Sequence, residues 1–269
     1  MSSETLLTEK RGRTAIMTFN RPESLNSINP PMAEAIRRQV DEWNNDGSVD
    51  AMIITGAGRG FCAGANVGVW RDQIAASDGS PLPSRTERPE TWLELFMRSK
   101  PVIAAVNGPA AGAGLTMTLG ADVRIASEKA QFAMRFVRMG LTPELASTHL
   151  LAHFVGMGNA MELMLTGRVI DAEYAFRVGL VSRVVKHESL LDEATQVAEE
   201  IGSNPPESIR AIKDLAWSNL DNGDLQSVLA AERAQTAAAR QRPYFKEAVR
   251  AFFEKREPDF LSVRTDNLL

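Results

Sequence analysis

Two glycine-rich segments, each shortly after a short apolar run, constrain this fold more than any other feature. The first segment spans residues 60–66 (GFCAGAN) and the second spans residues 107–114 (NGPAAGAG). The apolar runs before them, residues 51–55 and 101–106, read as strands. Two turns of small residues can direct two free backbone N–H groups at a single oxygen. That arrangement stabilises negative charge developing on a carbonyl, and it requires both turns together.

Bulk composition excludes several classes of protein. The chain has 269 residues, of which 44% are hydrophobic and 24% charged, values typical of a globular protein. Its formal net charge of -4 argues against nucleic acid as a partner. The single cysteine, Cys62, excludes an intramolecular disulfide framework and suits a reducing compartment. With neither a secretory leader nor a membrane-spanning apolar run in view, we expect a soluble, cytoplasmic protein.

Strand and helix patterns alternate through the first half of the chain. Strands are predicted over residues 14–19, 51–55, 101–106 and 122–126. Helices are predicted over residues 31–43, 91–99, 115–119 and 145–154. This order predicts an α/β fold with largely parallel strand pairing. Residues 75–90, rich in Ser, Pro, Gly and charge, are predicted to form a mobile loop that could close as a lid.

The C-terminal part of the chain is helical by pattern. Helices are predicted over residues 190–201, 206–220, 225–239 and 244–255. Their apolar faces exceed what a small appendage can bury alone, so we expect a homo-oligomer. We divide the chain into a core of residues 1–200, with the binding site, and a helical oligomerisation region of residues 201–269.

Several further motifs occur in an order that resembles the crotonase superfamily, the enoyl-CoA hydratase/isomerase family. Besides the two glycine-rich turns, they are NRP (20–22), LNS (25–27), LTGR (165–168), GLV (179–181) and FEKREP (253–258). The resemblance runs from about residue 14 to residue 260. It implies a spiral of ββα units with a C-terminal helical trimerisation region, assembled as a homotrimer or a dimer of trimers. It also implies an acyl-CoA thioester substrate, with no cofactor beyond the coenzyme A that the substrate carries.

The resemblance assigns roles to residues of both turns. The oxyanion N–H groups would come from Ala65 and Ala113, where family members usually have glycine in place of Ala113. An alanine N–H donates equally well from a helical backbone, and the first N–H groups of a helix lack intrahelical partners. The residues expected to contact the substrate or its coenzyme A are Ser27, Ala63, Gly64, Asn66, Val67, Gly112, Thr116, Phe136 and Lys255.

The chain departs from the hydratase pattern at its catalytic positions. The two glutamates of the family's hydratases would fall at Thr116 and Phe136, and neither residue is a carboxylate. Glu144 matches the position of the functional acid in some isomerases of the superfamily. One carboxylate is enough for a double-bond shift, because it can remove a proton and return it elsewhere. We expect burial to raise the pKa of this base toward neutrality.

Two other functions remain open at this point. One is an enoyl-CoA hydratase that uses Glu144 with an atypical partner, and the other is a non-catalytic acyl-CoA-binding or RNA-binding member of the fold, although the acidic balance argues against RNA. A dinucleotide fingerprint at residues 56–60 is rejected because Phe61 occupies the third glycine position and no helix pattern follows. His149 and His153 have a metal-ligand spacing, but the sequence places no third ligand beside them, so no metal site is expected.

Overall fold

The computed structural model describes residues 5–77, 80 and 90–264. Most of the predicted lid, residues 75–90, therefore lies outside the described residues. None of the helices within the described part combines the length and apolar character that a membrane span requires.

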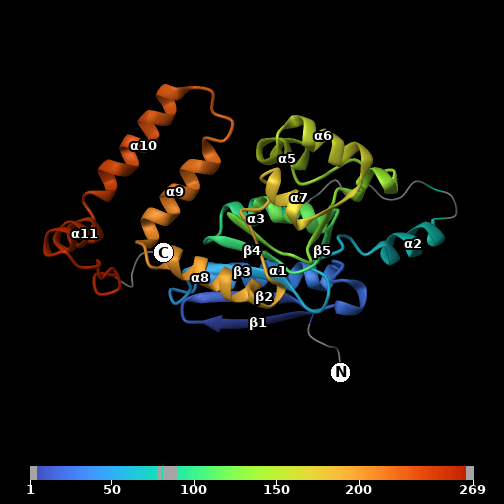
Figure 1. Cartoon of the computed structure of the whole chain (residues 1–269), viewed down its shortest axis with the longest axis horizontal. Helices are drawn as coiled ribbons and strands as arrows, with labels where there is room; N and C mark the ends of the chain where they lie inside the picture. Colours follow the sequence, from blue (N-terminus) through green and yellow to red (C-terminus); the bar gives the residue numbers. More distant parts are fainter. Residues whose placement is uncertain (1–4, 78–79, 81–89, 265–269) are drawn as a thin grey trace.

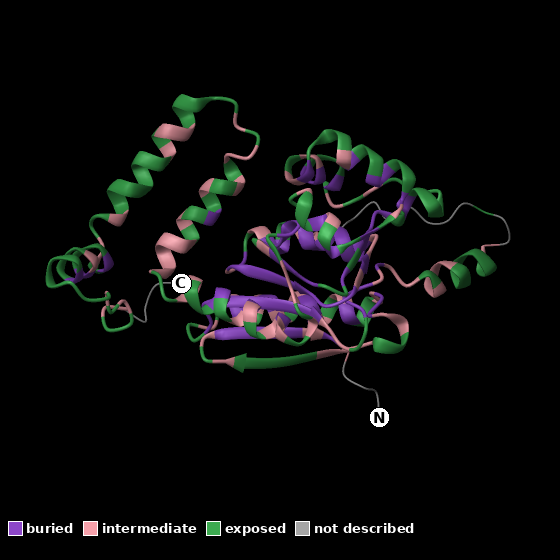
Figure 2. Ribbon diagram, in the orientation of Figure 1, coloured by how far each residue is buried: buried purple, intermediate pink, exposed green. Residues whose placement is uncertain are grey.

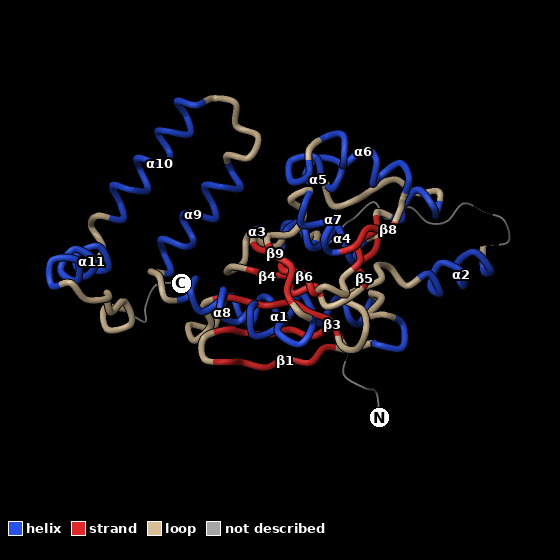
Figure 3. Tube along the Cα trace, viewed as in Figure 1, coloured by secondary structure: helices blue, strands red, loops and turns tan. Residues whose placement is uncertain are grey.

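Nine strands of the described residues form two sheets (Figures 1 and 3). The larger sheet has the order β1-β2-β3-β4-β6-β9, in which β1 and β2 are antiparallel and all later neighbours are parallel. The smaller sheet has the order β5-β7-β8. In chain order the strands are β1 (Leu6–Arg11), β2 (Thr14–Phe19), β3 (Ala51–Gly56), β4 (Val102–Val106), β5 (Pro109–Ala111), β6 (Val123–Ser127), β7 (Gln131–Ala133), β8 (Val169–Asp171) and β9 (Arg183–Val185).

Helices follow or separate most of these strands. They are α1 (Pro30–Asn44), α2 (Val67–Ala76), α3 (Trp92–Met97), α4 (Ala113–Thr116), α5 (Ser147–Val155), α6 (Met157–Thr166), α7 (Ala172–Arg177), α8 (Leu190–Gly202), α9 (Pro206–Ser218), α10 (Leu225–Ala239) and α11 (Pro243–Glu254). Short 3₁₀ turns lie at η1 (Pro22–Ser24), η2 (Met117–Gly120), η3 (Arg135–Met139) and η4 (His187–Ser189). The α/β prediction with largely parallel pairing is confirmed.

The central strands of the larger sheet, β2, β3 and β4, are buried on both faces because they are largely apolar at successive positions. Along β3, Met52 and Ile54 join the main core with α1, whereas Ala51 and Ile53 face the opposite side. Helix α8 covers that second side with a face formed by Leu190, Ala194, Val197 and Ala198. A strand covered on both faces needs apolar residues throughout, which explains the uninterrupted run seen in the sequence.

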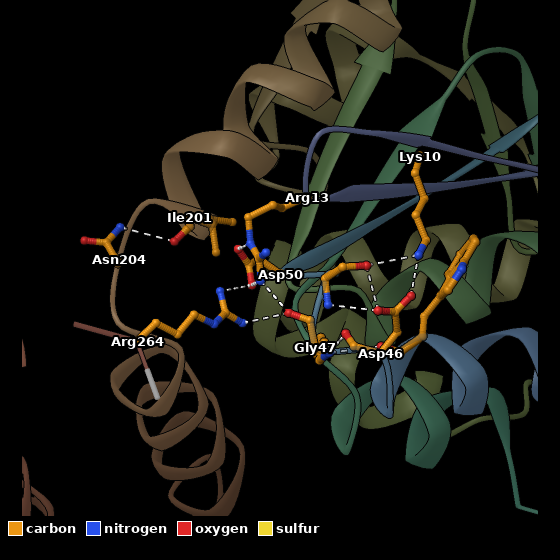
Figure 4. Close-up of polar contacts among 11 residues, drawn as sticks. Lys10, Arg13, Asp46, Gly47, Asp50, Ile201, Asn204 and Arg264 are labelled. Carbon is orange, nitrogen blue, oxygen red and sulfur yellow. Dashed lines mark hydrogen bonds and ion pairs between the residues drawn. The ribbon is translucent and has the colours of Figure 1, made fainter. Parts of the chain in front are cut away.

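The last three helices extend from the core (Figure 1). Helix α10 has no buried residue among those described, and its surface is largely exposed in Figure 2. Helix α9 is fixed to the core by Lys213, which is buried and donates to Asp122 (2.7 Å) and to the Phe96 carbonyl (2.6 Å). The segment after α11 returns to the core, where Arg264 and Arg13 both donate to Asp50, at 2.9 and 3.1 Å (Figure 4).

Most predicted elements occur close to their predicted bounds. Strand 14–19 and helix 225–239 match at both ends, and the other predicted strands differ by one residue at one or both ends. The predicted helix 115–119 begins earlier, as α4, and continues as the 3₁₀ turn η2. The statement that no helix follows the first turn is wrong, because α2 begins at Val67. Its start is capped by Asn66, whose side chain accepts a hydrogen bond from the Gly68 N–H (3.0 Å).

Candidate active site

The first glycine-rich turn follows β3 and is held by two buried asparagines. Asn26 donates to the carbonyls of Ala57 (3.0 Å) and Gly60 (2.8 Å). Asn107 donates to the Gly58 carbonyl (3.0 Å) and accepts from the Gly56 N–H (3.1 Å). Both side chains therefore satisfy polar backbone groups that a buried turn leaves unpaired. The NRP–LNS motif and the first residue of the second turn thus have structural roles in shaping the first turn.

The second glycine-rich turn packs directly against the first. The Cys62 carbonyl accepts a hydrogen bond from the Ala111 N–H (3.0 Å). A Cβ atom added to Gly114 would lie 2.1 Å from that same carbonyl oxygen, and one added to Gly108 would lie 2.0 Å from the Arg59 carbonyl oxygen. No side chain fits at either place, so glycine is required for the two backbones to approach this closely.

The turns meet at Gly64 and Ala113. Gly64 has φ +88°, and a Cβ atom there would lie 2.6 Å from the Ala111 carbonyl oxygen and 3.1 Å from the Ala113 nitrogen. The Ile28 N–H donates to the Gly64 carbonyl (2.8 Å), and the Asn66 N–H donates to the Ile28 carbonyl (3.1 Å). The intervening Ala65 N–H must therefore point away from Ile28.

Neither candidate oxyanion donor has an acceptor within the described residues. Helix α4 begins at Ala113 after Gly112, and its first internal bonds run from the N–H groups of Leu115 and Thr116 back to the Gly112 carbonyl (both 3.0 Å). The Ala113 N–H precedes them and, like the Ala65 N–H, donates to no other described group. An open donor at a helix N-terminus is suited to an anionic oxygen.

Phe136 and Thr116, which the resemblance places at the hydratase glutamate positions, are both buried beside the second turn. A Cβ atom on Gly112 would lie 4.0 Å from the Phe136 ring, and the Thr116 hydroxyl donates to the Ala113 carbonyl (3.4 Å). The Leu141 N–H donates to the Phe136 backbone carbonyl (3.0 Å), so the segment that continues to Glu144 begins beside Phe136.

Glu144 differs from its sequence-based description in two respects. Its predicted helix, 145–154, begins at Ser147, because Leu145 (φ 56°) and Ala146 (φ 52°) adopt left-handed backbone conformations. In the single chain Glu144 is exposed, so the expected burial in an apolar pocket is not observed. Two successive left-handed residues without glycine are strained, and such strain is concentrated at functional segments.

The remaining predicted contact residues divide into two groups. Ser27 is buried next to the residue 28–65 bridge, and Ala63, Asn66 and Val67 lie in or directly after the first turn, with Val67 exposed. Lys255 instead follows α11, which lies at the opposite end of the molecule from α2 and well away from β5 (Figure 1). Within one chain, Lys255 is therefore not brought to the two turns.

The interpretation of Cys62 as a packing residue is supported by its surroundings. Burial raises the pKa of its thiol to about 12, so it remains protonated and is a poor nucleophile. Its backbone, by contrast, joins the two turns through the bridge to Ala110.

An apolar cavity of about 630 Å³ lies elsewhere, between α9 and the core. Phe154, Ile209, Trp217 and Leu220 contribute to its lining, and no residue of either glycine-rich turn does. It is therefore separate from the candidate active site.

The two sheets and the junction of the two turns define an α/β protein of the crotonase fold with a paired-turn site. The sequence matches the family described as enoyl-CoA hydratase/isomerase over residues 9–263. The chain therefore belongs to the enoyl-CoA hydratase/isomerase family, and it is an enzyme of that family.

Individual relatives carry both isomerase and hydratase names. A 1,2-epoxyphenylacetyl-CoA isomerase of Escherichia coli (strain K12) is 36% identical over 249 residues, covering 91% of this chain and 93% of that protein. A short-chain-enoyl-CoA hydratase of Clostridium acetobutylicum is 35% identical over 258 residues, covering 96% and 97%. The crystal structure of a probable enoyl-CoA hydratase/isomerase from Mycobacterium abscessus superposes with a TM-score of 0.84 at 34% identity, covering 97% of this chain and 100% of that one.

Proposed function

We propose that this enzyme shifts the double bond of an enoyl-CoA thioester through an enolate. The N–H groups of Ala65 and Ala113 hold the thioester oxygen, and Glu144 moves the proton. The observation that supports this most is the close packing of the two turns at Gly64 and Ala113, with both donors open. Negative charge develops on the carbonyl oxygen in the transition state, where two preorganised donors stabilise it more than they stabilise the substrate.

The residues around the donors favour a reaction that needs one carboxylate. Hydration requires activation of water as well as protonation at the alpha carbon, a task usually shared by two groups. Thr116 and Phe136 supply no acid or base at the positions where the family's hydratases have glutamates. Glu144, carried by the segment that begins beside Phe136, is then the base that removes one proton and returns it to another carbon.

The backbone around Glu144 supports a functional role for that segment. A surface glutamate at the first turn of a helix needs no unusual backbone. Here Leu145 and Ala146 each take a conformation that costs an L-residue roughly 1–2 kcal/mol. The chain retains this cost directly after the candidate base, where it fixes the direction in which the segment enters α5.

The experiment compares Glu144→Gln with the unchanged enzyme on 3-enoyl and 2-enoyl thioesters, followed by absorbance of the conjugated product. We expect the unchanged enzyme to form the conjugated thioester from the 3-enoyl substrate. The variant should lose about 10²- to 10⁴-fold in kcat, the range for a general acid–base group. Full activity of Glu144→Gln would disprove the assignment of the base.

The alternative functions give different results in the same assay. Hydration of the 2-enoyl thioester, lost in Glu144→Gln, would identify a hydratase with an atypical partner residue. A tight thioester complex without turnover of either substrate would identify a binding protein. Both results contradict the proposed double-bond shift.

We further propose that the chain assembles as a homotrimer or a dimer of trimers. Phe252 and Phe253 of α11 are each 78% exposed in the single chain, and Leu225 of α10 is 65% exposed. Apolar side chains grouped on extended helices are suited to burial against neighbouring copies. Light scattering should give a mass of three or six chains, and a monodisperse monomer would contradict the proposal.

A further inference from the structure

Two histidines of α5 face an aspartate from the turn between α9 and α10. The His149 Nε2 lies 2.9 Å from an Asp221 carboxylate oxygen, and the His153 Nε2 lies 4.0 Å from the same oxygen. One ligand atom from each of the three residues lies within 4.8 Å of the others. The sequence pattern gave only the spacing of the two histidines, and the third group comes from a distant part of the chain.

The hydrogen bonding of one ring prepares it to bind a metal ion. The Nδ1 of His153 lies 3.2 Å from the His149 backbone carbonyl oxygen. Because a carbonyl only accepts, Nδ1 must carry the proton, which leaves the Nε2 lone pair of the neutral ring directed at the cluster. Histidine ligands of metals commonly donate their second ring N–H in this way.

The separations suit a small divalent transition metal. Ligand atoms about 2.0–2.1 Å from Zn²⁺ stand roughly 3.3 Å apart in a tetrahedral site. The present distances of 2.9 and 4.0 Å lie on either side of that value, so small side-chain rotations are sufficient. Two imidazoles with one carboxylate are a ligand set for Zn²⁺ that leaves a fourth position for water. The three side chains are partly exposed, between 38% and 68%, so an ion has direct access from solvent.

We propose that His149, His153 and Asp221 form a site for a divalent transition-metal ion of the zinc type. The ion joins α5 to the α9–α10 turn, two elements that flank one end of the apolar cavity through Phe154 and Leu220. It thereby fixes the C-terminal helices against the core, on the helix that follows the Glu144 segment. This site is separate from the chemistry proposed above, so either proposal can fail without the other.

Isothermal titration of the full-length chain, carrying no polyhistidine tag and treated with chelator, tests the site with Zn²⁺ and Co²⁺. We expect one ion per chain and visible absorption from bound Co²⁺. His149→Ala, His153→Ala and Asp221→Ala should each weaken binding at least about tenfold, since even loss of an outer-shell partner costs that much at established sites. His187, the third histidine, lies 2.9 Å from the Ser127 hydroxyl, and His187→Ala is the matched control.

Each outcome decides the proposal. Two results support the metal site. Zn²⁺ binding is lost in the three variants but unchanged in His187→Ala. Zn²⁺ raises the melting temperature only of the unchanged chain and of that control. Equal affinity in His149→Ala, or no binding at micromolar Zn²⁺, overturns the proposal. Unchanged affinity in Asp221→Ala overturns the link between α5 and the α9–α10 turn, leaving only a chelating histidine pair.

Discussion

Replacing Ala113 by proline tests the proposed oxyanion donor with little disturbance to the fold. Ala113 is the first residue of α4, the helical position where proline is best tolerated because the N–H there has no intrahelical acceptor. The substitution removes the Ala113 N–H, puts a ring methylene group on the nitrogen in place of its proton, and restricts the backbone of Gly112. The bonds from Leu115 and Thr116 to the Gly112 carbonyl, which define the start of the helix, remain possible.

The expected loss follows from the number of donors. In the proposed mechanism each of the two N–H groups stabilises part of the charge on the enolate oxygen, and removing one such donor costs about 2.7–4 kcal/mol of transition-state stabilisation. At 25 °C this corresponds to roughly a hundred- to a thousand-fold loss in kcat. The stability of the protein should change by less than about 1 kcal/mol, because no hydrogen bond within the described residues is lost.

The assay measures kcat and KM on the thioester substrate, with urea unfolding of each variant. Ala113→Gly, which keeps the N–H and restores the residue usual in the family, is the matched control and should retain activity. If Ala113→Pro unfolds like the unchanged enzyme and keeps its kcat within about threefold, the Ala113 N–H is not an oxyanion donor. Equal losses in both variants would instead indicate a general disturbance of α4.

Three further predictions concern stability and ionisation. Gly64→Ala should lower the free energy of unfolding by well over the roughly 1–2 kcal/mol of backbone strain alone, because its Cβ would lie 2.6 Å from a carbonyl oxygen. Gly12→Ala, at φ +57° with open space around it, measures the backbone strain alone in the same urea unfolding experiment. Desolvation by burial lowers the pKa of Lys100 to about 8, so competitive amine labelling of this lysine should titrate near pH 8, and a midpoint above pH 10 would contradict it. In the unfolded chain this lysine keeps its proton up to about pH 10.4. Because the unfolded state binds more protons between pH 8 and that value, the free energy of unfolding should rise with pH over this range. Lys213→Met should lower the free energy of unfolding by about 3–5 kcal/mol, because it leaves buried partners unpaired. Arg38→Met, at a surface ion pair, should lower it by under about 1 kcal/mol in the same urea unfolding experiment.

Local patterns were sufficient to predict the main strands and the two turns. Short, continuous apolar runs at residues 51–55 and 101–106, followed by glycine, favour buried strands, and the structure has β3 and β4 there. The short strands β5, β7, β8 and β9 were missed because three residues carry no measurable period. Strand β1 was missed for a different reason: Glu9 and Lys10 are exposed on an edge, so its pattern is polar.

The site residues could be predicted only as far as their roles depend on local sequence. The two turns predict a pair of converging N–H groups, and the family resemblance assigns them to Ala65 and Ala113. The exposure of Glu144 depends instead on what packs over its segment. The start of α5 was misplaced because propensity favours helix at Leu145 and Ala146, whereas the structure holds both in a left-handed conformation. Such a choice is made by surrounding contacts, which a local pattern does not contain.

Buried glycines and asparagines link the local sequence patterns to the contacts between distant segments. A Cβ atom added to Gly64, Gly108 or Gly114 would lie less than 3 Å from a backbone oxygen of another segment. The glycines in the sequence therefore indicate that two backbones approach closely, but they do not identify the second segment. Asn26 and Asn107 then supply the polar partners that the approaching backbone requires. The small side chains of the two turns therefore allow the two backbones to approach closely, and in the proposed mechanism this approach directs backbone N–H groups at the substrate. Restoring volume at any of these glycines should disturb catalysis and folding together, whereas removing one N–H should disturb catalysis alone.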